Sequence, residues 1–452
     1  MADHHRHHPF DHSKTPLEKV WRQALTPFEE FIHDEVSSGL LLMTCAVLAL
    51  VIANTGLVHY YEAILHTDIS FNIGPYTMSH TLHHWINDGL MALFFLMVGL
   101  EIKREALIGE LSEMRKAIFP IAAAIGGMVV PALIYVLFNA GTDASGGWGI
   151  PMATDIAFAV GVLALLGNRI PKALIAFLLA LAIVDDLGAV MVIAVFYTEQ
   201  INLIPLLFAS VSFALLILIN FAGVRKPLPY MLFGFLLWLG MMESGIHATL
   251  AGVLTALTIP ANSNCKGGIF SVNITALMDR FKQADQPEKG IMENAEQQAI
   301  MQTMENYVHN MESPLQRMEH ALHLWVAFLI VPLFALANAG ITIDFSQLNS
   351  IVTHPVTIGI SLGLVAGKVI GIFGAAFILV KMGWGRLPDN ITLSMIGGVS
   401  FLAGIGFTMS IFIASLAFSE QATYLLNAKI GIILASVISG VCGYLLLRRA
   451  TR

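Results

Sequence analysis

The feature that most constrains this chain is an acidic pair inside a long apolar segment. Residues 149–198 are almost all apolar or small, yet they contain Asp155, Asp185 and Asp186. If residues 173–197 form one helix, Asp185 lies about 18 Å along it, near the middle of a hydrocarbon layer about 30 Å thick. Each carboxylate costs roughly 2.5–3.5 kcal/mol at that depth, so a membrane protein keeps it paired, protonated or bound to a cation. The pattern therefore favours a site that a cation and protons share.

The composition supports a membrane protein. Of 452 residues, 56% are hydrophobic and 12% are charged, whereas an ordinary soluble domain has about 25% charged residues. Cys45, Cys265 and Cys442 have neither the even number of a disulfide framework nor the spacing of metal ligands. The net charge of -7 indicates no particular partner. We expect a lipid bilayer around the chain and no nucleic acid.

Hydropathy predicts an all-α polytopic membrane protein with about twelve spanning helices. The seventh and eighth are shorter than the roughly 20 residues that a span needs, and they are the weakest of the set. Between the first two, the alternating segment HTDISFNIGPYTMSH predicts a small β-hairpin outside the membrane. The predicted helices are 37–57, 83–101, 116–139, 148–167, 173–197, 203–222, 229–243, 245–259, 321–341, 354–380, 391–418 and 425–447.

The basic residues predict the orientation. All but two of the 24 Lys and Arg residues fall in the tails and the even-numbered loops, so both termini are expected in the cytoplasm. Lys429 can reach the outer interface from the start of the last helix. Lys368 lies halfway along its helix, and its natural partner is the carboxylate cluster.

These signals divide the chain into five parts. They are a cytoplasmic tail 1–36, helices one to eight at 37–259, a polar cytoplasmic insert 260–317, helices nine to twelve at 318–447 and a cytoplasmic end 448–452.

Two of these parts are polar. The N-terminal tail is rich in histidine, and a loose tail is favoured over a metal site. Its segment 17–33 has a mild helical period typical of a membrane-surface helix. The insert is expected to contain a helix that ends before Pro314, and a tolerated insertion is favoured over a regulator. The tail histidines are His4, His5, His7, His8 and His12.

Two groups of three helices have opposite orientation, as in an inverted repeat. Residues 116–197 begin inside and residues 354–447 begin outside. The middle helix of each group contains a weak point, at 151–155 and at 404–410. Paired interrupted helices of this kind indicate a transporter's binding site, although glycines also serve close helix packing.

Six segments together resemble the NhaA-type sodium/proton antiporter family. They are ATDIAFAVGVLALLG, LALAIVDDLGAV, SGIHATLAG, PLFALANAG, GLVAGKVIGI and GIGFTMSIFIASLAF. The resemblance implies twelve helices with crossed, interrupted helices four and eleven, and a homodimer joined partly through the outer hairpin. It also implies a pH-regulated antiporter of a bacterial inner membrane that extrudes Na⁺ or Li⁺ using the proton gradient. One lysine against three aspartates leaves two negative charges uncompensated, so more than one proton is expected to return per sodium ion, which makes the exchange electrogenic. Such a protein is no enzyme and needs no cofactor.

The resemblance also implies a binding site. Asp185 and Asp186 match the family's paired aspartates, and Lys368 matches the lysine that pairs with the first of them. Asp155 matches the aspartate of the interrupted helix, with Thr154 beside it.

Further matches lie away from this site. Asp88 matches an acid in the outer half of the second helix, and His247 matches a histidine linked to the pH response. The insert beside Glu319 is longer than the family pattern, which puts pH control in question. The cytoplasmic cluster linked to pH response is matched by Glu101, Arg104, Glu105, Glu319, His320 and His323.

The chemistry of the residues leaves several roles open. Adjacent residues on a helix point about 100° apart, so one aspartate of the pair is expected to bind the cation while the other meets Lys368. Asp155 is expected to neutralise helix ends rather than bind the ion. Lys368 can hold its partner in place or release a proton itself. Glu101, Arg104 and Glu105 can also form an ordinary solvated helix end. His320 and His323 can be interfacial residues without a role in the pH response.

Two other functions are weighed against exchange. An intramembrane aspartyl protease needs two aspartates on facing helices that share a proton, whereas Asp185 and Asp186 are neighbours on one helix. A passive cation channel would conduct without returning protons. The lack of a GxxxxGK[ST] segment disfavours ATP-driven pumping.

Deletion of residues 268–308 tests the view of the insert. No intramembrane charge lies there, so we expect transport to persist in everted vesicles at matched expression. Complete loss of transport in a correctly inserted protein would contradict this, and a displaced pH profile would make the insert a regulator.

Overall fold

The structure is a computed structural model that describes most of the chain. The described residues are 35–73, 76–198, 201–262, 267–286, 291–342, 346, 348–383 and 391–451. The predicted histidine-rich tail, with its surface helix at 17–33, lies outside them, as does the tip of the predicted hairpin at Gly74 and Pro75.

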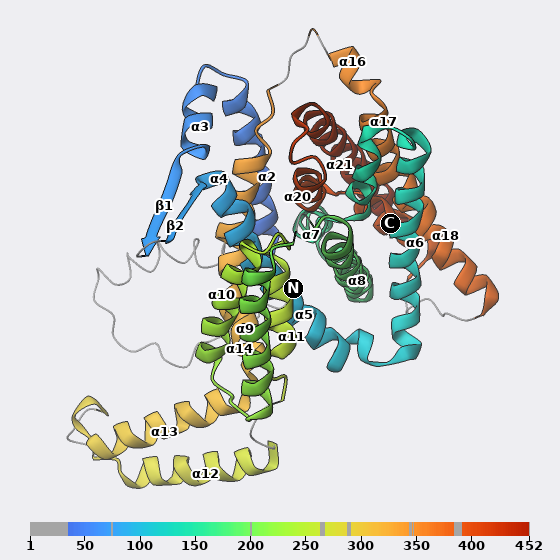
Figure 1. The fold of residues 1–452 in the computed structure, drawn as a ribbon. Helices are drawn as coiled ribbons and strands as arrows, with labels where there is room; N and C mark the ends of the chain where they lie inside the picture. The colour runs from blue at the N-terminus through green and yellow to red at the C-terminus, as the bar shows by residue number, and fades with distance from the viewer. Residues whose placement is uncertain are drawn as a thin grey trace.

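The described chain is a bundle of helices with one two-stranded sheet (Figure 1). The elements of the first half are α2 Glu35–Ala53, α3 Val58–Leu65, β1 Asp68–Ile73, β2 Tyr76–Thr81, α4 Leu82–His84, η1 Trp85–Leu90, α5 Met91–Leu107, η2 Glu110–Ser112, α6 Met114–Asn139, η3 Asp143–Met152, α7 Ile156–Ala164, η4 Gly167–Arg169, α8 Lys172–Phe196 and α9 Leu203–Phe221. Those of the second half are α10 Pro227–Met242, α11 Leu250–Thr258, α12 Gly267–Gln283, η5 Ile291–Glu293, α13 Ala295–Met311, α14 Pro314–Trp325, η6 Val326–Ile330, α15 Val331–Asn338, α16 Leu348–Val352, α17 Pro355–Leu362, η7 Gly363–Gly367, α18 Lys368–Met382, α19 Leu393–Leu402, α20 Phe407–Ala417 and α21 Ala422–Ala450.

Each of the twelve predicted segments contains a helix, but the predicted count of spans is not reached. Among the described residues, 7 helices are long and apolar enough to cross a membrane, or up to 10 if each bent pair is one span. The difference arises at α10 and α11, where 16 and 9 helical residues are too short for this measure. The chain is thus a multi-pass membrane protein in which these two helices decide the final number.

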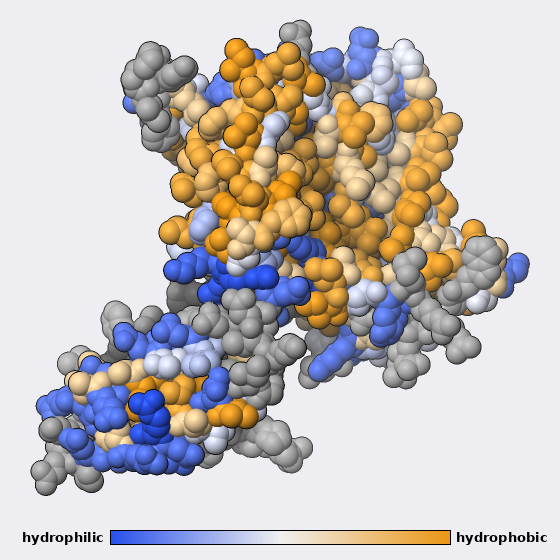
Figure 2. Space-filling model, turned by 60° about the horizontal axis from the view of Figure 1, so that its bottom comes forward, coloured by the Kyte–Doolittle hydropathy of each residue, from blue (hydrophilic) through white to orange (hydrophobic). Residues whose placement is uncertain are grey.

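The surface of the bundle is suited to lipid. Leu137, Ile204 and Phe221 are 81%, 82% and 84% exposed, which in water would cost roughly 1.5–3 kcal/mol for each side chain. Figure 2 shows a largely hydrophobic surface over the bundle and a more hydrophilic surface where it meets α12 and α13. The exposed apolar side chains therefore mark the part of the molecule that the bilayer covers.

The two polar connections follow the sequence prediction in part. β1 and β2 pair antiparallel, with Asp68 opposite Thr81, so the predicted hairpin is confirmed. The insert holds the predicted helix, α13, which ends at Met311, but also a helix that the sequence did not predict, α12. A capping box at Ser313 then starts α14, seven residues before the predicted ninth helix. We refer below to the end of the bundle with β1 and β2 as the hairpin end.

The apolar interior forms two main cores that meet along α5. The larger core takes in α2, α7, α15, α20 and α21, and it includes Phe95 of α5. The smaller core takes in α9, α10, α11 and α14, and it includes Leu96 of α5. Successive residues of one helix thus face different cores, so α5 holds the two halves of the molecule together.

Helices α6 and α18 approach most closely where two glycines face each other. A Cβ placed on Gly371 of α18 would overlap the carbonyl oxygen of Gly126 of α6, and the reverse is also true. Such small residues let helix backbones approach in a membrane. This close contact holds Lys368, the first residue of α18, against the first three-helix group.

Gly371→Ala should lower stability by about 1–3 kcal/mol, because the added methyl group forces the two helices apart. The matched control is Gly374→Ala, one turn away on α18, where an added Cβ meets nothing within 4 Å. Both variants gain the same helix propensity, about 1 kcal/mol. The measurement is the apparent unfolding temperature in detergent, and an equal result for the two variants would contradict the packing argument.

Candidate functional site

The site is built where two broken helices cross. Helix α7 follows η3 after a break at residues 153–155, with a bend of 41°, and α20 follows α19 after a break at residues 403–406, with a bend of 47°. The two breaks bind each other: Asp155 N donates to Ile405 O at 2.7 Å, and Thr154 Oγ1 donates to Ala403 O at 2.7 Å. The predicted interruptions are therefore confirmed, and they lie in contact.

Glycine permits the second break. A Cβ on Gly404 would overlap the carbonyl oxygen of Leu364 in η7. The backbone of the break therefore packs directly on the span that carries Lys368. This contact brings the lysine to the crossing.

Asp155 binds the N-termini of two helices at once. Its Oδ1 accepts from Phe158 N of α7 at 2.9 Å, and its Oδ2 accepts from Thr408 N of α20 at 3.0 Å. Thr408 Oγ1 also donates to Oδ2, at 2.5 Å. A carboxylate is favourable beside the unpaired N–H groups of a helix start. These contacts fit the role expected of Asp155, which is to neutralise helix ends.

Asp185 is the partner of Lys368. The lysine Nζ lies 2.5 Å from Asp185 Oδ2, and both side chains are at most 1% exposed. Thr154 Oγ1 also lies 2.7 Å from this oxygen, so Asp185 and Ala403 O share its single hydroxyl proton. The first aspartate of the pair is thus held by an ion pair and by the break before α7.

Asp186, the second aspartate of the pair, differs from Asp185 in its contacts. It is 1% exposed, and neither carboxylate oxygen has a hydrogen-bond partner among the described residues. Asp185, Glu101, Asp155 and Lys368 are the charged groups close enough to act on it. One lysine therefore faces several buried acids, and a buried carboxylate without partners is costly unless it is protonated or binds a cation.

The cluster predicted at the opposite end from the hairpin is only partly assembled. Arg104 Nε lies 2.9 Å from Glu319 Oε1, and Arg104 Nη1 lies 3.1 Å from Glu105 Oε1. Glu101, one turn earlier on α5, interacts with this arginine and also with Asp186. It thus stands between the cluster and the site. The exposed side chains of His320 and His323 on α14 take no part in these ion pairs.

Asp88 and His247 belong to a second group, at the hairpin end. Asp88 Oδ2 lies 3.0 Å from His84 Nε2, and Asp88 is close enough to His247 for their charges to interact. His80 of β2 stacks on His84 at 4.3 Å and lies 4.0 Å from Glu243. Burial lowers the pKa of His80, as does the neighbouring His84, while Glu243 acts in the opposite direction.

The sequence missed two groups that the fold brings in. Thr408, which binds Asp155, was noted only as part of the interrupted run. Asn338 is fully buried, donates to Asn87 Oδ1 at 2.8 Å and lies 3.1 Å from His83 Nε2. A buried amide within the apolar run PLFALANAG was a usable signal, because such a group needs partners.

Broken helices that meet around buried carboxylates are typical of secondary transporters. Residues 29–447 match the family described as Na⁺/H⁺ antiporter 1. The chain belongs to this family, which is one of transporters and not of enzymes.

Curated relatives agree with this assignment. The Na(+)/H(+) antiporter NhaA 1 of Saccharophagus degradans is 49% identical over 432 residues, which cover 96% of this chain and 93% of that protein. The Na(+)/H(+) antiporter NhaA of Sulfurimonas denitrificans is 49% identical, with 96% and 97% covered. That of Oleidesulfovibrio alaskensis is 47% identical, with 96% and 95% covered.

The contacts of Asp155 and Asp186 predict opposite effects on stability. Asp155→Ala should cost about 2–4 kcal/mol, because two helices lose their N-terminal acceptor. Asp186→Asn should leave stability unchanged or raise it, because it removes a buried charge without partners. The measurement is thermal unfolding of the two purified proteins at one pH. Equal losses in both variants would show that the contacts of Asp155 do not hold the crossing together.

Proposed function

We propose that this chain exchanges Na⁺ or Li⁺ for H⁺, and that both use the carboxylates of Asp185 and Asp186. Membership of the Na⁺/H⁺ antiporter 1 family supports the reaction. The site is supported by the buried Asp186 carboxylate beside the Asp185–Lys368 pair, since neither of its oxygens has a hydrogen-bond partner among the residues that the structure describes.

The chemistry of the donors suits a small hard cation. Sodium and lithium prefer oxygen ligands, and a dehydrated ion in a low dielectric is best held by a carboxylate and by backbone carbonyls that broken helices leave free. Asp186 supplies the carboxylate. Its chain neighbour Asp185 contacts Thr154 of the first break, and Thr154 in turn contacts Ala403 O of the second. When no cation is bound, the same burial favours the neutral, protonated form of Asp186. One group can therefore bind either cargo, and no cofactor is needed.

The surplus of acids supports electrogenic exchange. Lys368 neutralises one carboxylate, while Asp155 and Asp186 remain at the crossing. If more than one of these acids takes a proton when sodium leaves, more than one proton returns for each sodium ion. The inward proton gradient would then extrude sodium, with a net movement of charge.

Alternating access would use the two three-helix groups, which we propose form an inverted repeat. The first runs from α6 to α8 and the second from α17 to α21, and the middle span of each is broken. In transporters of this architecture, rocking of one repeat against the other exposes the central site to each side in turn. The close α6–α18 contact at Gly126 and Gly371 joins the groups.

The membrane topology is part of the proposal. If α10 and the segment 245–259 each cross the bilayer, they complete a set of twelve spans. The distribution of Lys and Arg then places both termini, and the insert 260–317, in the cytoplasm. This orientation fits a bacterial inner membrane, and the hairpin end faces outward.

We also propose a homodimer and a pH-dependent response. The β1–β2 hairpin at the edge of the bundle supports the first, since it offers backbone to a second copy (Figure 1). The ion pairs of Arg104 with Glu105 and Glu319 support the second, since Glu101 connects them to Asp186. His320 and His323 would act only as exposed residues beside this group, and His247 would act through Asp88.

Competition between sodium and protons tests the shared site. Apparent sodium affinity should weaken with acidification by up to about tenfold per pH unit for each proton displaced, because the two ligands exclude each other. Sodium added to purified protein should also release protons into weakly buffered solution. A sodium isotherm that does not change with pH, without proton release, would mean separate sites.

The Asn variants complete this test. Asp186→Asn and Asp185→Asn should abolish proton release and sodium-induced dequenching of a pH-gradient dye in everted vesicles. Asp143→Asn, the same change at an exposed acid of η3, is the matched control and should behave as wild type. Sodium current through Asp186→Asn without proton flow would favour a channel.

A further inference from the structure

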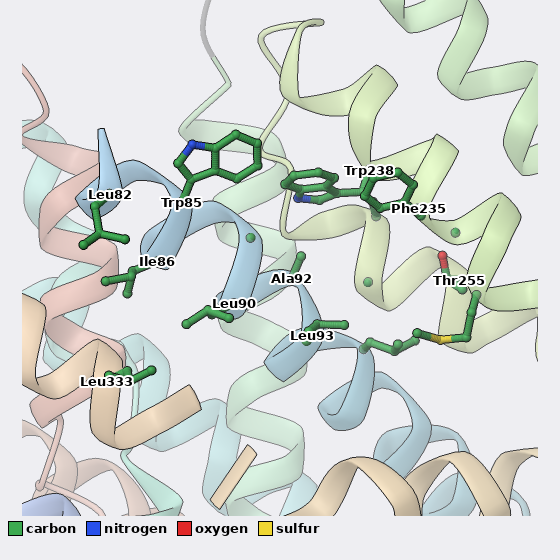
Figure 3. Close-up of a pocket in the computed structure, with 16 residues that line it drawn as sticks. Leu82, Trp85, Ile86, Leu90, Ala92, Leu93, Phe235, Trp238, Thr255 and Leu333 are labelled. Atoms are coloured by element: carbon green, nitrogen blue, oxygen red, sulfur yellow. The ribbon is translucent and has the colours of Figure 1, made fainter. Parts of the chain in front are cut away.

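An apolar groove of about 560 Å³ opens on the side of the bundle, away from the carboxylate site. Its walls come from the span that contains η1 and α5, from α10 and from α11, with Leu333 at one edge (Figure 3). Phe235 stands at the rim and is 55% exposed. The groove therefore faces the layer that surrounds the protein.

The lining determines what can fill the groove. Trp85 and Trp238 lie 6.0 Å apart at its hairpin end, and Trp238 Nε1 donates to Asp88 O at 3.1 Å, which fixes the ring. Thr255 contributes the one side-chain hydroxyl of the lining, and this oxygen has no hydrogen-bond partner among the described residues. Water would find almost no polar partners here, so an apolar occupant is favoured.

The length of the groove matches one leaflet. Lining residues run from Leu82 to Leu96 along one span, which is about 21 Å at 1.5 Å per residue, and the part from Trp85 to Leu96 is about 16 Å. Half of the hydrocarbon thickness is about 15 Å. Tryptophan is typical of the boundary between hydrocarbon and headgroups, so the Trp85–Trp238 pair marks the level at which a headgroup would begin.

The charges beside this mouth select the headgroup. Glu243 is 54% exposed on its side chain and lies 4.0 Å from His80, which packs edge-on against Trp85. Residues 58–84 and 243–249 contain no Lys or Arg. Lys429 of α21 lies close enough to His83 for their charges to interact. An anionic headgroup beside Glu243 would be repelled by this exposed carboxylate, whereas a primary ammonium group could pair with it.

We propose that this groove binds one acyl chain of a phosphatidylethanolamine molecule from the leaflet at the hairpin end. The chain lies between α5, α10 and α11, and the ammonium group pairs with Glu243. Ile86 belongs to the larger core, while Trp238 and Ala251 belong to the smaller one. The bound chain therefore packs against both cores along the helix that joins them.

The test is photolabelling of the full protein in vesicles. The probe is a phosphatidylethanolamine with a diazirine in its acyl chain, and labelled peptides are located by mass spectrometry. We expect labels concentrated in α5, α10 and α11. Labels spread evenly over lipid-facing helices, α9 and α18 included, would mean that the groove binds no particular lipid, and would overturn the proposal.

A variant that fills the groove sharpens this test. A Cβ on Gly89 meets only Trp238 and Trp85, at 3.8 and 3.9 Å, so a larger side chain enters the groove without a backbone clash. Gly89→Leu should reduce labelling of the groove about tenfold, because it removes room for roughly two methylene groups. Gly374→Leu, at a position with open space, is the control and should not change it. Undiminished labelling in a folded Gly89→Leu protein would contradict the proposal.

The headgroup is tested separately, with a surface change that leaves the groove intact. A phosphatidylglycerol probe with the same chain should label the groove less than the phosphatidylethanolamine probe. Glu243→Gln should abolish this preference, because it removes the charge that pairs with the ammonium group. Equal labelling by both probes in the wild-type protein would overturn the headgroup assignment. These readouts measure binding alone, so they stand apart from any result on sodium transport.

Discussion

The buried ion pair between Lys368 and Asp185 is the interaction on which the rest of the site depends. Taking two charges out of water costs several kcal/mol for each ion, and only close geometry with further hydrogen bonds recovers it. Here the separation is 2.5 Å, and Thr154 Oγ1 lies 2.7 Å from the same carboxylate oxygen. Because Thr154 lies in the break before α7, the pair requires the broken helix. The same arrangement leaves the neighbouring Asp186 without a hydrogen-bond partner in the part of the chain that the structure describes, and the proposed cargo site rests on this.

The two broken helices support each other through Asp155. Each break exposes N–H groups that have no partner within their own helix, and deep in a membrane no water is present to satisfy them. One carboxylate accepts from Phe158 and from Thr408, and so serves the N-termini of both α7 and α20. An unbroken helix has no unpaired N–H groups at this depth, so it would not need this carboxylate. One break alone would use only one of its two oxygens. The crossing is therefore a single structural unit. Making either helix continuous would remove contacts that stabilise the break in the other.

Helix α5 connects the site with the rest of the molecule. It contributes to both apolar cores, through Phe95 and Leu96. Glu101 acts on Asp186 from the same helix, and Arg104 one turn later holds Glu105 and Glu319. The π-helical turn η1 before it holds Asp88 and forms a wall of the apolar groove. One span thus carries residues of both end groups, of the apolar groove and of the neighbourhood of Asp186.

The sequence by itself determined the membrane class, the helix in each predicted segment, the hairpin, the two interruptions and the acidic pair. These features depend on hydropathy, turn chemistry and the cost of buried charge, all of which act over short stretches of chain. It did not determine the helix α12 or the number of spans, because α10 and α11 are too short for hydropathy alone to decide.

The tertiary structure alone decided which groups meet. Asp185 and Lys368 are 183 residues apart in the chain, and Asp155 meets Thr408 across 253 residues. It also left Asp186 without a hydrogen-bond partner among the described residues, placed Glu101 close enough to act on it, and kept His320 and His323 exposed. Contacts between distant helices depend on how closely their backbones approach, as at Gly126 and Gly371, and a local pattern of residues carries no measure of that distance.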